Sequence, residues 1–133
     1  MPSGGGYPVL VIQTIAADPL APANGREVVS RFAGRVPYAV LADARLLISE
    51  LITNSVRHGH PPEETVEVTA ECGERVLSVH VLDRGPGFDP AARYGPPYDT
   101  GWGLRLLASL SSEWGVDPGP GNRGSDAWFV LRW

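Results

Sequence analysis

The feature that most constrains the fold is a long amphipathic helical pattern over residues 38–58. At about 100° per residue, its apolar residues fall on one side, and that side must be buried against another element. Because Leu46 and Leu47 flank the polar side, two interpretations stay open: a solvated helix face, or one wall of a cleft with apolar sides. The polar side chains occupy a wedge of roughly 60° and comprise Asp43, Glu50, Asn54 and Arg57, with His58 at its edge.

The rest of the pattern predicts a sheet for this helix to cover. Two alternating segments, 65–73 and 75–83, predict a β-hairpin. The predicted fold class is an α/β two-layer sandwich (α+β), a mostly antiparallel mixed sheet with helices on one face. We expect a flexible N-terminus over residues 1–6 and one domain over 7–133. The other predicted elements are a strand at 7–15, helices at 23–34 and 102–114, a turn at 117–124 and a closing strand at 125–133.

Composition argues against several classes of protein. The chain has 133 residues, which suits one domain with a real core. Its net charge of −4, without a basic run, argues against direct nucleic-acid binding. No apolar run reaches the roughly 18 residues of a membrane span, and no secretory signal pattern opens the chain. With Cys72 as its one cysteine, the chain has no intrachain disulfide, and a cytoplasmic location is predicted.

Glu50 and Asn54 stand one helical turn apart and could act together. An amide oxygen is a hard ligand that suits Mg²⁺. A carboxylate one turn away can orient a water or accept a proton from a hydroxyl. Taken alone, the pair is weak evidence for a site, because most polar stripes of this kind are solvated helix faces.

Two glycine-containing segments add chemistry. In "VLDRGPGFD" (81–89), Asp83 ends a predicted strand and can accept a hydrogen bond from an exocyclic amine such as that of adenine. Glycines at alternate positions after it let a backbone approach a ligand closely. In "TGWGLRLL" (100–107), two glycines precede a predicted helix, whose N-terminal N–H groups can bind phosphate. For each segment alone, a surface turn or a glycine helix cap is the competing interpretation.

Taken in order, E-x-x-x-N-S-x-x-H, D-x-G-x-G and G-x-G-L resemble the gyrase/histidine-kinase/MutL-type ATPase superfamily over about residues 38–133. The chain is similar in particular to the bacterial anti-sigma factor serine/threonine kinases, above all the short actinobacterial ATP-binding regulators. The ending "LSSEWGVDPGPGNRGSDAWFVL" is similar to the usual close of that family. The polar helix stripe is then one wall of a nucleotide cleft.

The resemblance implies a role for each matching residue. Glu50 matches the general base, Asn54 the Mg²⁺ ligand and Asp83 the residue that binds the adenine amine. Segment 88–100 matches the lid over ATP. The remaining ATP-binding positions implied by the resemblance are Gly85 and Gly87 beside the base, and Gly101, Trp102, Gly103, Leu104 and Arg105 near the phosphates.

Two positions depart from the family pattern. Trp102 stands where family members often carry Arg, and Arg105 is a candidate to supply that charge. Gly124-Ser125-Asp126 stands where the family often has Gly-Lys-Thr, which predicts an acid near the adenine. His58 could contact phosphate or cap its helix, whereas His60 and His80 are interpreted as structural and Cys72 as a small buried hydrophobe.

The resemblance implies ATP and Mg²⁺ as cofactors, a sigma factor that is held inactive, an antagonist protein that is phosphorylated on Ser or Thr, and a homodimer. Two alternatives remain open. One is a non-catalytic regulator that acts by protein contact. The other is the detached catalytic domain of a histidine kinase, although the chain lacks room for a helical hairpin with a phosphoacceptor histidine.

Overall fold

A computed structural model describes residues 7–57, 65–83, 105–119, 121 and 124–133. One strand, two helices and a pair of strands follow one another as the sequence predicts, and residues 105–110 are also helical. No helix in these ranges is long and apolar enough to cross a membrane. The elements in chain order are β1 (Val9–Ala16), α1 (Ala21–Ser30), α2 (Tyr38–Arg57), β2 (Thr65–Gly73), β3 (Val76–Asp83), β4 (Glu113–Pro118) and β5 (Ser125–Arg132).

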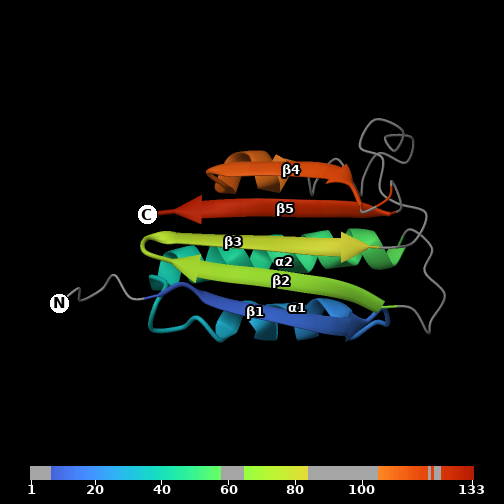
Figure 1. Ribbon diagram of the computed structural model, residues 1–133, viewed down its shortest axis with the longest axis horizontal. Coiled ribbons are helices and arrows are strands. Elements are labelled where there is room, and N and C mark those ends of the chain that lie inside the picture. Colours follow the sequence, from blue (N-terminus) through green and yellow to red (C-terminus); the bar gives the residue numbers. More distant parts are fainter. Residues whose placement is uncertain (1–6, 58–64, 84–104, 120, 122–123) are drawn as a thin grey trace.

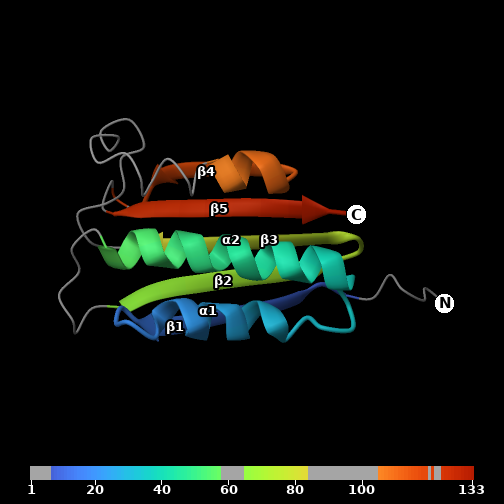
Figure 2. The same cartoon turned by 180° about the vertical axis from the view of Figure 1, so that it is seen from behind.

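The strands form one five-stranded sheet in the order β1-β2-β3-β5-β4, and every pairing is antiparallel. The helices lie together on one face of this sheet, with α2 behind β2 and β3 and α1 behind β1 (Figures 1 and 2). The two-layer architecture predicted from the sequence is therefore confirmed. The long helix, the β2–β3 hairpin and the closing strand begin and end within a few residues of their predicted bounds.

The core lies between the sheet and the helices. Ala44, Leu47, Ile48 and Ile52 of α2 are fully buried, and the alternate residues of each central strand meet them. Cys72 is buried among them, as predicted, and burial raises the pKa of its thiol. The other large, fully buried side chains include Phe32, Phe129, Leu77, Leu107, Val28, Val29, Val66, Val68 and Val79.

The prediction of a helix over 102–114 is wrong at its C-terminal end. The described helix ends at Leu110, and Glu113–Pro118 forms edge strand β4 instead, so the predicted turn at 117–124 also begins too early. Ser111 ends the helix by donating its hydroxyl to the carbonyl of Leu107, and Ser112 N–H bonds to the carbonyl of Val130 on β5. The pairing with β5, which lies far along the chain, decides the conformation of this segment.

Helices α1 and α2 approach closely at Gly25. A Cβ atom built on Gly25 lies 2.2 Å from Ile52 Cδ1, and Ile52 is fully buried. Close packing of this kind leaves little room for a larger residue. Gly25 therefore sets the distance at which α1 packs against α2.

We expect Gly25→Val to lower the free energy of unfolding by about 2 kcal/mol, because the added methyl groups overpack the α1–α2 contact. Chemical denaturation monitored by circular dichroism measures the change. Asn24→Val is the matched control, since Asn24 is exposed in the same helix and takes the same β-branched side chain. Equal denaturation midpoints for the two variants would contradict a packing role for Gly25.

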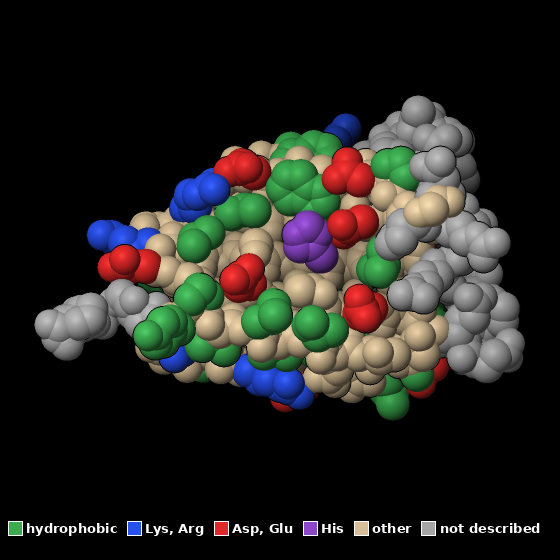
Figure 3. Space-filling model, in the orientation of Figure 1, with side chains coloured by type: hydrophobic (Ala, Val, Ile, Leu, Met, Phe, Trp, Pro, Cys, Tyr) green, Lys and Arg blue, Asp and Glu red, His purple; other side chains and the backbone are tan. Residues whose placement is uncertain are grey.

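No described helix covers the other face of the sheet. On edge strand β1, Leu10 and Ile12 remain 55% and 59% exposed on this face. Apolar and acidic side chains are interspersed there around a histidine (Figure 3). We call it the open face, and it carries the outward residues of all five strands.

Candidate functional site

Buried polar side chains gather at one edge of the molecule. Among the described residues, the polar or charged ones that are buried are Asn54, Ser55, Asp83 and Ser125. They belong to the last turns of α2, the end of β3 and the start of β5. These three chain ends lie together at the same end of the strands (Figure 2). Buried polar groups are unusual inside a protein and are usually held by specific partners, so this gathering is the candidate functional site.

Local structure brings these side chains together. The alternation of β3 turns Asp83 toward the helices, on the same side as Val79 and Val81. In the β3–β5 ladder Asp83 is the direct partner of Ser125, so these two residues are neighbours on the inner face. Helix α2 crosses above them and presents Asn54 and Ser55 in its last turn.

A hydrogen bond joins α2 to the end of β3. Ser55 Oγ donates to Asp83 Oδ2 at 2.8 Å, and the two residues are 7% and 3% exposed. A hydroxyl that donates to a buried carboxylate fixes its orientation and lowers the cost of burying it. One carboxylate oxygen of Asp83 is thus held by the helix that carries Glu50 and Asn54.

Sequence reasoning missed Ser55 as a functional residue. A signal was present. Ser55 falls on the apolar side of α2, where a polar residue is unusual and needs a partner. The strand-ending Asp83 is that partner.

We expect Ser55→Ala to lower the free energy of unfolding by about 1–3 kcal/mol, because the buried Asp83 carboxylate loses a donor. The same variant should weaken ATP binding, since Asp83 is the proposed adenine contact. Denaturant titration and calorimetry measure the two effects. Ser78→Ala, on the open face of β3, is the control and should change neither by more than about 0.5 kcal/mol. An unchanged stability of Ser55→Ala would contradict the role of this bond.

Asn54 and Glu50 lie one turn apart on α2, as predicted. Asn54 is 7% exposed, and no side-chain hydrogen bond of Asn54 is found within the described part of the chain. Glu50 is half-buried on the same helix. A buried amide with no side-chain partner among the described residues is a candidate to bind a ligand atom. Leu46, which flanks the polar wedge, is 44% exposed, whereas Leu47 is fully buried in the core.

The prediction that Asp126 places an acid near the adenine is wrong. The Asp126 side chain points to the open face, where both carboxylate oxygens lie within 3.1 Å of His80 Nδ1. The inner residue at this point of β5 is Ser125, which is opposite Asp83. Strand alternation is the physical reason, because neighbouring residues point to opposite faces. Asp126 therefore adds no charge beside Asp83.

Several predicted site residues lie outside the described residues. They are Gly85, Gly87, Gly101, Trp102, Gly103 and Leu104, together with the predicted lid 88–100 and the histidines His58 and His60. Arg105 is described. It is exposed at the first described position of the helix 105–110.

The described residues fit Mg²⁺ held together with a nucleotide. Within the described ranges, no three His, Cys, Asp or Glu side chains gather to hold a metal ion by themselves. Mg²⁺ usually takes one or two protein oxygens and completes its shell with phosphates and water. The buried amide of Asn54 would supply one hard oxygen of this kind.

Comparison with known proteins agrees with this geometry. A family model described as histidine kinase-like ATPase domain matches residues 15–129. The chain is 38% identical over 89 residues to the serine-protein kinase RsbW of Listeria monocytogenes serovar 1/2a, and 37% identical to that of Listeria innocua serovar 6a. Each match covers 62% of this chain and 57% of the kinase.

A solved structure has a similar fold. It is the crystal structure of the RsbU and RsbW domains of Rv1364c from Mycobacterium tuberculosis, with a TM-score of 0.69 and 23% sequence identity. The similarity covers 96% of this chain and 32% of the other. That likeness shows the fold alone. The family model matches the amino-acid sequence of this chain over most of its length. The chain therefore belongs to the histidine kinase-like ATPase domain family.

Proposed function

We propose that this protein binds ATP with Mg²⁺ and phosphorylates a serine or threonine of an antagonist protein, and that it also holds a sigma factor inactive. The observation that carries the proposal is the gathering of Asn54, Ser55, Asp83 and Ser125 at one edge, with Glu50 one turn away on α2. The relatives named serine-protein kinase RsbW support the reaction type. Because the match covers 57% of those kinases, activity and partners are inferred from the site and the family together.

Asp83 is the proposed contact for the base of ATP. Its carboxylate is buried, and Ser55 holds one oxygen, so the group is oriented before ligand arrives. An oriented carboxylate can accept a hydrogen bond from the exocyclic amine of adenine, and guanine offers no amine at the same position. Gly85 and Gly87 would let the chain pass beside the base. This arrangement predicts a preference for ATP over GTP.

Asn54 and Glu50 are the proposed residues at the phosphates. Bound Mg²⁺ supplies charge neutralisation at the phosphate oxygens. Asn54 would offer its amide oxygen to the metal, and Arg105 with the second glycine segment, 101–104, would contact the phosphates. Glu50 would accept the proton of the partner's hydroxyl while that oxygen forms its bond to the γ-phosphorus and the bond to the ADP oxygen breaks. The protein's contribution is mainly position and charge.

The proposed assembly and location follow from the family. We propose a homodimer in the cytoplasm that holds a sigma factor inactive. A non-catalytic module is the second candidate, favoured if Trp102 disables the phosphate site. A detached histidine-kinase domain is the third.

The test combines ATP binding with phosphate transfer. Calorimetry should show Mg²⁺-dependent ATP binding in the micromolar range. Incubation with radiolabelled ATP and antagonist proteins from the same organism should then give acid-stable phosphate on Ser or Thr. Binding without transfer to any of these proteins would favour the non-catalytic module. Acid-labile phosphate would favour the histidine-kinase domain, and absence of ATP binding would overturn the proposal.

A further inference from the structure

The outer surface of α2 carries an exposed apolar track that leads to Glu50. The track consists of Tyr38, Ala39, Ala42 and Leu46, and its two large side chains, Tyr38 and Leu46, are 87% and 44% exposed. Leu46 lies one helical turn before Glu50 and on nearly the same side of the helix. In Figure 2 this surface of α2 faces the viewer, and no described helix or strand lies in front of it. The track therefore runs from solvent to the proposed general base.

A cation borders the track on the side that faces α1. Arg45 directly precedes Leu46, so its side chain leaves the helix about 100° away from that of Leu46, whereas Glu50 lies on the opposite side of the track. Arg45 Nη1 donates to Ser30 Oγ on α1. Ser30 Oγ in turn donates to the carbonyl of Arg26 at 2.8 Å. These contacts hold the half-buried guanidinium between the two helices, beside the track.

No carboxylate of the described residues pairs with Arg45. The ion pairs in this part of the chain are His80 with Asp126 and Arg132 with Glu113, and both lie on the open face. A guanidinium has five N–H donors and can bind both oxygens of one carboxylate. Because the Ser30 hydroxyl takes only one of the donors of Arg45, the others can bind a carboxylate of a partner.

We propose that the apolar track and Arg45 dock the acceptor segment of the antagonist, and that they select a segment with apolar side chains and an acidic residue near its serine or threonine. The apolar side chains would cover Ala42 and Leu46. The acid would bind Arg45 on one side of the track, while the hydroxyl reaches Glu50 on the other. This inference rests on the proposed function, in which Glu50 accepts the proton of that hydroxyl.

The length of the track fits a short segment of a protein. At 1.5 Å per residue, Tyr38 and Glu50 are roughly 18 Å apart along the helix axis. An extended chain covers this distance with about six residues. Arg45 is roughly 7.5 Å from Glu50 along the same axis. The acid that binds Arg45 is therefore expected about two to four residues from the acceptor hydroxyl.

Continuity with the proposed catalytic residue favours this occupant over a second copy of the chain. A substrate hydroxyl that reaches Glu50 brings the neighbouring residues of its own chain against the surface around Glu50. Leu46 is part of that surface, and burial of an exposed leucine is favourable. A second copy seated on the track would instead block the access of a protein substrate to Glu50.

Binding of two synthetic peptides tests the proposal without ATP. Both peptides have about ten residues, with leucines and a central serine. One carries an aspartate about three residues before the serine, and the other carries a lysine there. Fluorescence anisotropy measures the affinities, and amide chemical-shift changes locate the peptide. We expect the aspartate peptide to bind at least about tenfold more tightly than the lysine peptide.

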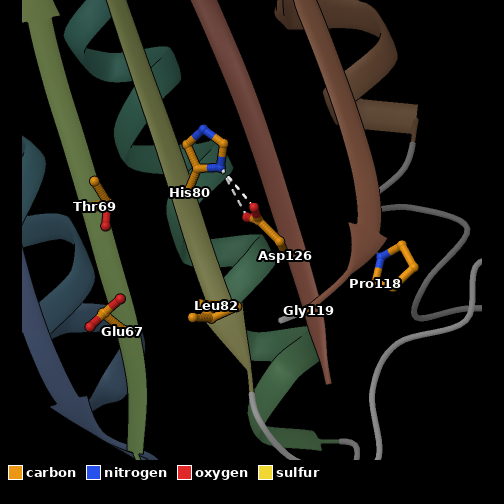
Figure 4. Close-up of a pocket in the computed structure, with 7 residues that line it drawn as sticks. All are labelled: Glu67, Thr69, His80, Leu82, Pro118, Gly119 and Asp126. Atoms are coloured by element: carbon orange, nitrogen blue, oxygen red, sulfur yellow. Dashed lines mark hydrogen bonds and ion pairs between the residues drawn. The ribbon is translucent and has the colours of Figure 1, made fainter. Parts of the chain in front are cut away.

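The shift changes should fall on residues 38–50 of α2. Signals on the other side of the sheet provide an internal control. A hollow of about 370 Å³ opens there, and Glu67, His80 and Asp126 are among the residues that line it (Figure 4). The signals of these three residues should not move when the aspartate peptide is added.

Charge reversal at Arg45 gives the sharpest test. Arg45→Glu should weaken binding of the aspartate peptide at least about tenfold and strengthen binding of the lysine peptide. Arg31→Glu is the matched control, because Arg31 is exposed at the end of α1 and the change in charge is the same. It should alter both affinities less than about twofold. Arg45→Gln keeps a donor for Ser30 and should also lose the preference for aspartate, so that a lost contact between the helices does not explain the result.

Truncation of Leu46 tests the apolar part of the track. Leu46→Ala should weaken binding of both peptides at least about threefold, because the leucines of the peptide lose their contact. Leu20→Ala is the matched control, since Leu20 is 65% exposed just before α1 and loses the same side chain. Its affinities should equal those of the wild type.

Several results would overturn the proposal. They are undetectable binding of both peptides, equal affinities for the two, shift changes that map to the open face, and equal effects of Arg45→Glu and Arg31→Glu, which would indicate net charge alone. A chain that is dimeric by sedimentation and becomes monomeric in Leu46→Arg would show that a second copy covers the track. If the peptides bind as expected but no antagonist accepts phosphate, the proposed kinase function fails while the docking surface stands. If Arg45→Glu transfers phosphate to the antagonist with the wild-type KM, the docking proposal fails while the kinase function stands.

Discussion

Asn54→Ala is expected to abolish the Mg²⁺ dependence of ATP binding and to weaken the affinity for Mg-ATP at least about a hundredfold, or about 2.7 kcal/mol. Asn54 is buried at the end of α2, and its amide oxygen is the proposed protein ligand of the metal. Alanine at this position offers no ligand to the metal, and no other described side chain on this turn replaces it. Calorimetry with and without Mg²⁺ measures the effect.

The stability of Asn54→Ala distinguishes a loss of metal binding from a loss of folding. Within the described part of the chain, the buried Asn54 side chain makes no hydrogen bond, so it is a cost to the ligand-free protein. Asn54→Ala should therefore be at least as stable as the wild type in a denaturant titration. Thr53→Ala, one residue earlier on α2, is the matched control for binding. Mg-ATP affinity that is equal in wild type and Asn54→Ala would contradict the role of Asn54.

Elements with strong local patterns could be predicted from the sequence. The helix 38–57 carries a continuous apolar stripe, and the hairpin strands alternate over their whole length. Both signals are local and agree with the tertiary contacts, so propensity and packing point to the same structure. Asn54 and Asp83 were identified by motif, and the structure brings their elements together.

The features that sequence reasoning missed depend on distant parts of the chain. Strand β4 follows the leucine-rich helical segment 105–110, and its conformation is determined by hydrogen-bonded pairing with β5. Ser55 becomes meaningful only when Asp83 is placed beside it. The direction of Asp126 depends on the register of β5 against β3, and a shift by one residue reverses the face. A linear pattern contains none of these pairings explicitly.

Glu50→Ala is expected to reduce phosphate transfer to the antagonist by about 10²–10⁴-fold, the usual contribution of a general base, while ATP binding stays within about twofold. Glu50 is half-buried one turn before Asn54, and in the proposed site its carboxylate takes the proton of the hydroxyl without holding the nucleotide. Single-turnover transfer of radiolabelled phosphate measures the rate, and calorimetry measures the affinity. Asp43→Ala, which removes a carboxylate two turns earlier from the same polar wedge, is the matched control and should transfer phosphate at the wild-type rate. If Glu50→Ala and Asp43→Ala transfer phosphate equally fast, the proposed role of Glu50 as general base is wrong.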